Sequence, residues 1–168
     1  FLSIEQAIDY LHPDVIINTA AYTAVDKAEE AQTQAAQINH LGARNLALAC
    51  EKKSIPLIHL STDYVFSGTK TSPYFETDPT QPINYYGWLK LAQEQYIQMH
   101  HRLHGLKYLI IRPSNAYGHN QNPNTNQGLI GVILNRLKNN QPIEVWGDGS
   151  VIRDYLWVED LCQAVVDL

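Results

Sequence analysis

The order of apolar and polar positions along the chain predicts short buried strands that alternate with longer helices. Compact apolar runs bounded by polar residues or proline indicate strands, and longer stretches with apolar residues every three or four positions indicate helices. Strands are expected at residues 15–18, 57–61, 107–111, 143–146 and 154–157. Helices are expected at about residues 4–12, 29–53, 84–104, 127–139 and 158–168, with long loops at 62–83 and 113–126.

This alternation predicts an α/β fold. Strands joined by helices of ten or more residues form right-handed βαβ units, and therefore a parallel sheet with flanking helices. Ligands bind such sheets at the carboxyl ends of the strands. The polar segments that follow Asn18, Ser61 and Arg112 all leave expected strand ends. We therefore expect the side chains of these segments to gather on one edge of the sheet.

Composition excludes several classes of protein. A hydrophobic fraction of 45% supports a folded core rather than intrinsic disorder. The net charge of −5 argues against nucleic-acid binding through bulk positive charge. Cys50 and Cys162 lie far apart and form no CxxC pair, so a reducing, cytoplasmic setting fits better than a disulfide framework or a zinc site. No apolar run approaches the about 18 residues of a membrane span, so no membrane association is expected.

Tyr86 and Lys90 carry the sharpest chemical signal. Two residues four positions apart share one face of a helix, and a nearby ammonium group lowers the pKa of a phenol from its ordinary value of about 10. A tyrosine tuned in this way exchanges a proton with an alcohol while a hydride leaves or arrives. Alone, such a pair also occurs by chance on surface helices. Thr62 strengthens the signal, because its hydroxyl follows the strand at 57–61 and could bind the same substrate oxygen.

Together with four further motifs, this triad resembles the extended short-chain dehydrogenase/reductase family, the NAD-dependent epimerases and dehydratases of nucleotide sugars. The further motifs are NTAA at 18–21, NHLG at 39–42, RPSNAYG at 112–118 and GDG through RDY at 147–155. They occur in the family's order over nearly the whole chain. The resemblance implies a Rossmann-like parallel sheet and a soluble oxidoreductase or isomerase acting on a nucleotide-diphosphate sugar.

The resemblance also implies a role for each matching residue. The catalytic residues would be Thr62, Tyr86 and Lys90. The contacts to NAD or NADP would be Thr19, Ala20, Ala21, Asn39, Ser61, Tyr86, Lys90 and Pro113. The substrate contacts would be Asp63, Tyr64, Asn115, Glu144, Trp146 and Arg153. No residue is assigned to a metal.

The resemblance divides over the length of the chain. Residues 23–29, 61–66 and 73–76 resemble dTDP-4-dehydrorhamnose reductases, whereas the part from Arg112 onward resembles UDP-glucose 4-epimerases. The second part supplies the substrate contacts, so our first hypothesis is a 4-epimerase and our second a 4-keto-sugar reductase. A 4,6-dehydratase ranks third, because Tyr64 stands where the dehydratases have glutamate. A non-catalytic fragment that binds a partner or a nucleotide is a further alternative.

The family's glycine-rich phosphate loop, G-x-x-G-x-x-G after a first strand, does not occur in this sequence. We therefore interpret the chain as a segment of a longer enzyme. Residues 1–112 would be a partial NAD(P)-binding domain with the catalytic triad, and residues 113–168 would hold substrate-binding segments and returning elements of the sheet. The resemblance also implies a homodimer, with Gln93, Tyr96 and Ile97 buried between subunits.

Three histidines, His100, His101 and His104, end the helix expected at 84–104. Two histidines four positions apart on a helix can bind a metal. We interpret them instead as the solvated end of the helix, because no cysteine or carboxylate cluster accompanies them in the sequence.

Overall fold

The computed structural model describes residues 3–122, 128–145 and 147–168. The chain forms two compact units, Phe1–Arg112 and Pro113–Leu168, and each is described by itself.

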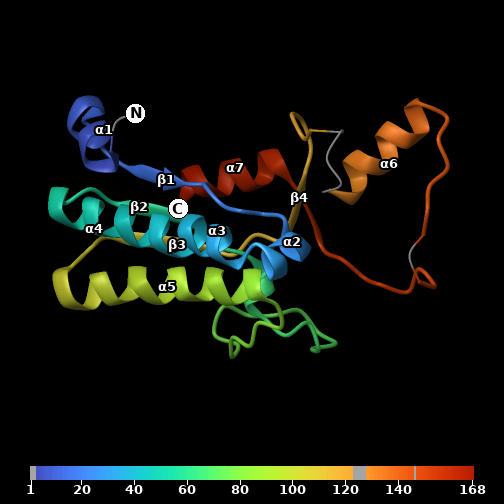
Figure 1. Ribbon diagram of the computed structural model, residues 1–168, viewed down its shortest axis with the longest axis horizontal. Coiled ribbons are helices and arrows are strands. Elements are labelled where there is room, and N and C mark those ends of the chain that lie inside the picture. Colours follow the sequence, from blue (N-terminus) through green and yellow to red (C-terminus); the bar gives the residue numbers. More distant parts are fainter. Residues whose placement is uncertain (1–2, 123–127, 146) are drawn as a thin grey trace. The chain divides into compact units, whose positions relative to one another are not determined.

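A parallel three-stranded sheet lies at the centre of the first unit (Figure 1). Its strands are β1 (Ile16–Asn18), β2 (Leu57–Leu60) and β3 (Tyr108–Ile111), in that spatial order. Asn18 pairs with His59, and His59 with Ile110. The predicted α/β fold with a parallel sheet is confirmed, and the carboxyl ends of the strands lie at one edge of the sheet.

The helices of the first unit are α1 (Ile4–Leu11), α2 (Val25–Glu30), α3 (Gln32–Ala36), α4 (Ala43–Lys53) and α5 (Tyr85–His104). The single helix expected at 29–53 is therefore wrong. The chain breaks at Ala31 and then passes through a π-helical segment, η1 (Gln37–Gly42), before α4 begins. The π turn directs Asn39 into the protein, where its side chain is fully buried.

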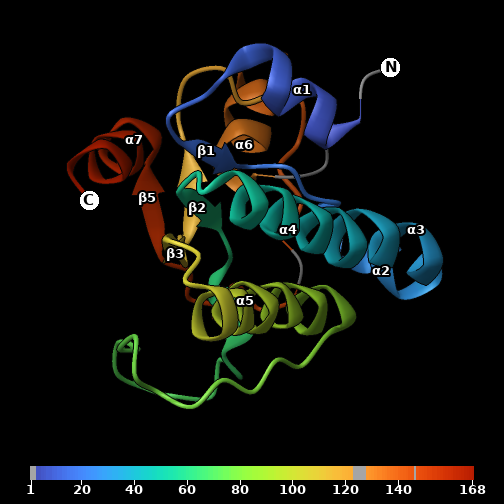
Figure 2. The same cartoon turned by 90° about the vertical axis from the view of Figure 1, so that its left-hand side faces the viewer.

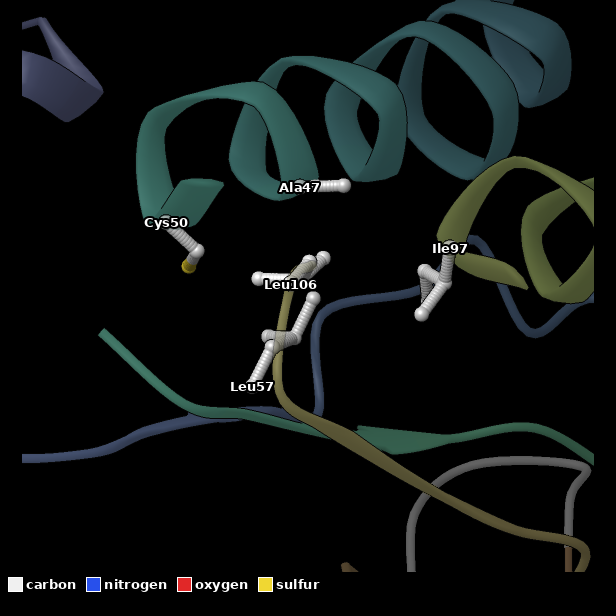
Figure 3. Close-up of a cluster of buried hydrophobic side chains, with 5 residues drawn as sticks. All are labelled: Ala47, Cys50, Leu57, Ile97 and Leu106. Atoms are coloured by element: carbon white, nitrogen blue, oxygen red, sulfur yellow. The ribbon is translucent and has the colours of Figure 1, made fainter. Parts of the chain in front are cut away.

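The core of this unit joins α4 and α5 to the sheet. Figure 3 shows Ala47 and Cys50 of α4 facing Leu57, Leu106 and Ile97, and all five are buried. Burial of one large aliphatic side chain contributes about 1.5–3 kcal/mol, so this cluster fixes both helices on the sheet. Figure 2 shows the two helices side by side. Gln93 and Ile97 are buried within the chain itself, so their expected burial between subunits is wrong.

The second unit contains two short parallel strands, β4 (Asn115–Tyr117) and β5 (Tyr155–Trp157), and two helices, α6 (Leu129–Lys138) and α7 (Val158–Asp167). β4 lies within the stretch expected to be a loop, because a three-residue strand is too short to produce an apolar pattern. Residues 143–145 form no strand, contrary to expectation, and Trp146 lies outside the described residues. Within the described parts of the chain, the helices fall short of the length and apolarity needed to cross a membrane.

Candidate active site

Thr62 is held rigidly where the chain leaves β2. It caps the 3-10 helix η2 (Asp63–Val65), and its hydroxyl accepts a hydrogen bond from the Tyr64 amide at 3.2 Å. The same hydroxyl donates to Oδ1 of Asp63 at 3.1 Å. With 6% of its surface exposed, Thr62 has one defined side-chain position at the carboxyl edge of the sheet.

Gly87 allows η2 to lie directly against the first turn of α5. A Cβ atom on Gly87 would come within 2.4 Å of the Tyr64 carbonyl oxygen and 3.0 Å of Cβ of Pro82. The Gly87 amide meanwhile donates to the side chain of Asn84, the N-cap of α5, at 2.7 Å. This close approach brings Tyr86, the residue before Gly87, next to the turn that carries Thr62. Gly87 lies within the sequence motif of Tyr86, but its part in this close packing is visible only in the folded structure.

The Thr62 side chain lies beside the Tyr86 phenol. Burial raises the pKa of Tyr86 to about 12, the nearby Thr62 hydroxyl lowers it, and the nearby Asp63 raises it. The Tyr64 ring stands edge-on to the Tyr86 ring, with centroids 6.0 Å apart. The pKa of Tyr86 therefore moves in the opposite direction to the one expected from its spacing to Lys90. In this structure Tyr86 is a protonated phenol at neutral pH.

Lys90 follows Tyr86 by one turn of α5 and is 2% exposed. Its Nζ donates to the carbonyl oxygen of Leu60 at 2.6 Å, at the end of β2. Burial lowers the pKa of Lys90 to about 8, although the carboxylate of Glu94 acts in the opposite direction. The ammonium form still predominates at pH 7. Lys90 is thus a buried cation fastened to the strand that leads into Thr62.

Glu94, four residues after Lys90 on α5, is a buried carboxylate. It accepts hydrogen bonds from Nη2 of Arg112 at 2.7 Å and from Nε of Arg112 at 3.0 Å, and also from the Ser61 hydroxyl. The hydrogen bonds to Glu94 raise the pKa of Arg112. Glu94 therefore ties the end of β3 and the end of β2 to α5, which fixes the helix that carries Tyr86 and Lys90.

A second buried chain of hydrogen bonds crosses the sheet. Oδ1 of Asn18 accepts from the Ala20 amide at 3.1 Å, so Nδ2 of Asn18 is the group that donates to Nδ1 of His59 at 3.0 Å. Nε2 of His59 then carries the proton and donates to Gln93 at 2.8 Å, and Gln93 donates to the backbone carbonyl of Asn39. Burial lowers the pKa of His59 to about 4, which keeps the ring neutral.

Asn39 connects this hydrogen-bond chain to the segment after β1. Its Oδ1 accepts from the Tyr22 amide at 2.7 Å, and its Nδ2 donates to the Tyr22 carbonyl at 3.0 Å. The turn at 19–21 is thus held at one end by Asn18 and at the other by Asn39. Thr19 and Ala20 are exposed on this turn, and Ala21 is half-buried.

Sequence reasoning missed His59, Gln93 and Glu94 as parts of the site. A signal was available, because Lys90, Gln93 and Glu94 follow Tyr86 at helical spacing on the face that points to the sheet. Polar residues on a buried helical face need partners, and this need predicts a buried network. The partners themselves come from strands far away in the sequence.

The second unit brings two of the expected substrate residues near one another. Asn115 opens β4 opposite Tyr155, and its Nδ2 donates to the Asp154 carbonyl at 2.9 Å, next to Arg153. Arg153 and Glu144 are exposed, whereas Pro113 and Asn115 are half-buried. Glu144 lies in the segment between α6 and β5, and Trp146 lies outside the described residues.

The RmlD substrate binding domain family matches residues 2–168. The chain belongs to this family. A putative UDP-glucose 4-epimerase of Methanocaldococcus jannaschii is 31% identical over 96% of the chain and 53% of that protein. The chain spans about half the length of the curated relatives it matches.

Two similar solved structures are named for the two activities that the sequence motifs indicate, one for each activity. The UDP-glucose 4-epimerase of Thermotoga maritima, solved with UDP-glucose, has a TM-score of 0.92 and 28% identity over 96% of this chain and 53% of that chain. The dTDP-4-dehydrorhamnose reductase of Bacillus anthracis, solved with NADP, has a TM-score of 0.84 and 34% identity over 97% and 54%. The chain is therefore similar both to nucleotide-sugar 4-epimerases and to a dTDP-4-dehydrorhamnose reductase.

Proposed function

We propose that the intact protein transfers a hydride to and from C4 of a nucleotide-diphosphate sugar with NAD or NADP, and that its net reaction is 4-epimerisation. The observation that carries this proposal is that Thr62 and Tyr86 lie beside one another at the carboxyl end of β2, with the Lys90 cation one turn later on the same helix. The relatives named as 4-epimerases support the choice of reaction. In this proposal residues 1–112 bind the cofactor and residues 113–168 the nucleotide sugar.

The residues at the sheet edge fit a dinucleotide. The ammonium of Lys90 has three N–H donors, and the Leu60 carbonyl takes one of them. The small side chains of Ala20 and Ala21 on the braced turn allow a ligand to approach the backbone closely. With Thr19, Asn39, Ser61 and Pro113 these residues are the proposed contacts. The bound nicotinamide supplies the hydride chemistry at the sugar carbon.

Thr62 and Tyr86 have distinct proposed roles at the sugar oxygen. Thr62 holds the oxygen by a hydrogen bond, because its own position is fixed by η2. Tyr86 donates its proton when the sugar carbon is reduced and takes the proton back when that carbon is oxidised. The second direction needs phenolate, and the proposed role of Lys90 is to stabilise it by its positive charge. In this structure Nζ of Lys90 bonds the Leu60 carbonyl, so this role requires Nζ to turn toward the phenol in the complex.

Six residues are the proposed substrate contacts. Asp63 and Tyr64 lie in η2 beside the catalytic pair. Asn115 and Arg153 would bind the diphosphate. The guanidinium group of Arg153 matches the paired oxygens of phosphate. Glu144 and Trp146 would flank the nucleotide base. We also propose a homodimer for the intact protein.

A second candidate function is reduction of a 4-keto sugar, as in dTDP-4-dehydrorhamnose reductases. One observation favours it: residues 23–29, 61–66 and 73–76 resemble these reductases. The identity of 34% to the Bacillus anthracis reductase gives further support.

The two candidates are separated by incubating the intact protein with two pairs of reactants. UDP-glucose with catalytic NAD⁺ should give UDP-galactose without net reduction of the cofactor if the protein is a 4-epimerase. Stoichiometric consumption of NADPH with a dTDP-4-keto-6-deoxy sugar would identify the reductase instead. If the protein turns over neither pair, nor other nucleotide sugars with either cofactor, the proposal is wrong.

A further inference from the structure

Three potential metal ligands meet where α4 and α5 end. Glu51 comes from the last turn of α4, and His100 and His104 come from the last two turns of α5. One ligand atom from each residue lies within 4.8 Å of the others. Nδ1 of His100 contacts Oε2 of Glu51, and Nδ1 of His104 lies 3.7 Å from Oε1 of the same carboxylate. The carboxylate that the sequence did not show beside these histidines comes from 49 positions earlier in the chain.

The surroundings of this cluster favour a cation. α4 and α5 run side by side in the same direction, so the partial negative charges of both C-terminal ends lie near the cluster (Figure 1). The two lysines that follow Glu51 pair with other acids instead, Lys52 with Glu5 at 2.8 Å and Lys53 with Asp9 at 2.5 Å. The side chain of His100 is 8% exposed and that of His104 is 49% exposed, which leaves an entry path from solvent.

We propose that Glu51, His100 and His104 bind one divalent transition-metal ion, with Zn²⁺ as the best match. Two imidazoles and a carboxylate are a usual ligand set for zinc, and water would complete the tetrahedron. Donor atoms around tetrahedral zinc are separated by roughly 3.4 Å, so the site closes when His104 rotates toward the metal and the Glu51 carboxylate moves out of its close contact with Nδ1 of His100.

The proposed zinc is structural rather than catalytic. Tyr86 and His100 are separated by about four turns of α5, or roughly 21 Å along the helix axis. The metal would clamp the C-terminal ends of α4 and α5, in addition to the Glu51–His100 contact and the buried cluster of Ala47, Cys50 and Ile97. The two proposals are therefore independent, and zinc binding can be measured without any assay of turnover.

The test uses the intact protein after treatment with a chelator, and measures Zn²⁺ binding by calorimetry and the zinc-dependent rise in melting temperature. His104→Gln should remove one equivalent of bound zinc, or weaken that equivalent at least about 100-fold, and should abolish most of the rise in melting temperature. Because His104 is half-exposed, the metal-free variant should keep its fold.

The matched control is His119→Gln. His119 lies 3.9 Å from Glu159, so this pair resembles the site but has only two ligands, both exposed. The control should bind as much zinc as the unchanged protein. Equal zinc stoichiometry and affinity in the unchanged protein and His104→Gln would overturn the proposal and leave an ordinary ion pair. Glu51→Gln, which keeps a hydrogen-bonding oxygen, should weaken zinc binding as His104→Gln does.

Discussion

Residues 1–112 and residues 113–168 hold their candidate site residues in different ways. In the first unit Thr62, Tyr86 and Lys90 are each less than a tenth exposed. Hydrogen bonds hold Thr62 and Lys90 in place, and burial holds Tyr86. In the second unit Glu144 and Arg153 are exposed. Among the residues that the structure describes, Nη1 of Arg153 donates only to the backbone carbonyl of its neighbour Ile152.

The difference indicates how each region would contribute to catalysis. A group that is already held in its working position loses little freedom when the substrate binds, so it acts mainly on the chemical step. An exposed arginine must be ordered by the substrate and acts mainly on binding. We therefore expect changes in the first unit to alter kcat or stability, and changes in the second unit to alter KM alone.

Tyr86→Phe should have the largest effect. Loss of the phenol proton should lower kcat by about 10²–10⁴-fold, with KM and the melting temperature nearly unchanged. Steady-state kinetics measure both constants on whichever of the two reactant pairs the intact protein turns over. The control is Tyr85→Phe, because the Tyr85 hydroxyl makes only a long contact of 3.5 Å to the Gln32 carbonyl among the described residues. Near-normal turnover by Tyr86→Phe would remove this residue from its proposed role.

Glu94→Gln tests whether the first unit depends on its buried ion pair. Removing the charge leaves the guanidinium of Arg112 without its partner, and breaking a buried pair costs about 3 kcal/mol or more. Denaturant unfolding should show this loss. Glu5→Gln removes one charge of the exposed pair with Lys52 and should cost less than about 1 kcal/mol. Equal losses in the two variants would contradict a special role for the buried pair.

His59 should make the first unit sensitive to acid. Its pKa is lowered to about 4 in the folded protein, against an ordinary value of 6.5, so the unfolded chain takes up the proton first as the pH falls. The stability that depends on neutral His59 is fully present above about pH 6.5 and is lost down to about pH 4, by about 3 kcal/mol.

Unfolding free energies measured at several pH values between 7 and 4 check this prediction. Carboxylates also titrate in this range, so the comparison is with His59→Asn, which lacks the titrating ring. His59→Asn should be less stable at pH 7 and should lose less stability on acidification. Parallel curves for the two proteins would exclude His59 as the source.

The sheet and the shared helical face of Tyr86 and Lys90 could be predicted because both depend on local patterns. Apolar runs locate β1 to β3, and the spacing of Tyr86 and Lys90 places both on one helical face. The pKa of Tyr86 could not be predicted in the same way, because it depends on how deeply Gly87 allows η2 to pack against α5. Spacing gives proximity to Lys90 but not the direction of its Nζ, which bonds the Leu60 carbonyl.

Features that depend on distant contacts were missed for a related reason. Gly42 ends the π-helical segment, but the buried position of Asn39 depends on its hydrogen bonds to the backbone of Tyr22, 17 positions earlier. Likewise, His100 and His104 looked solvated because Glu51 reaches them only through the packing of α4 on α5. The sequence pattern locates elements, and the partners of buried polar groups follow only from their tertiary arrangement.

Arg153→Gln should have the smallest effect and tests the second unit. Because Arg153 is exposed, its loss should leave the unfolding free energy within about 0.5 kcal/mol of the original value. Loss of one charged contact to the substrate diphosphate should raise KM by about five- to tenfold, with kcat unchanged. Lys138→Gln, which removes an exposed cation at the end of α6, should leave both constants unchanged. A fall in kcat for Arg153→Gln would mean that this residue also acts on the chemical step, and the proposed division between the two units would then fail.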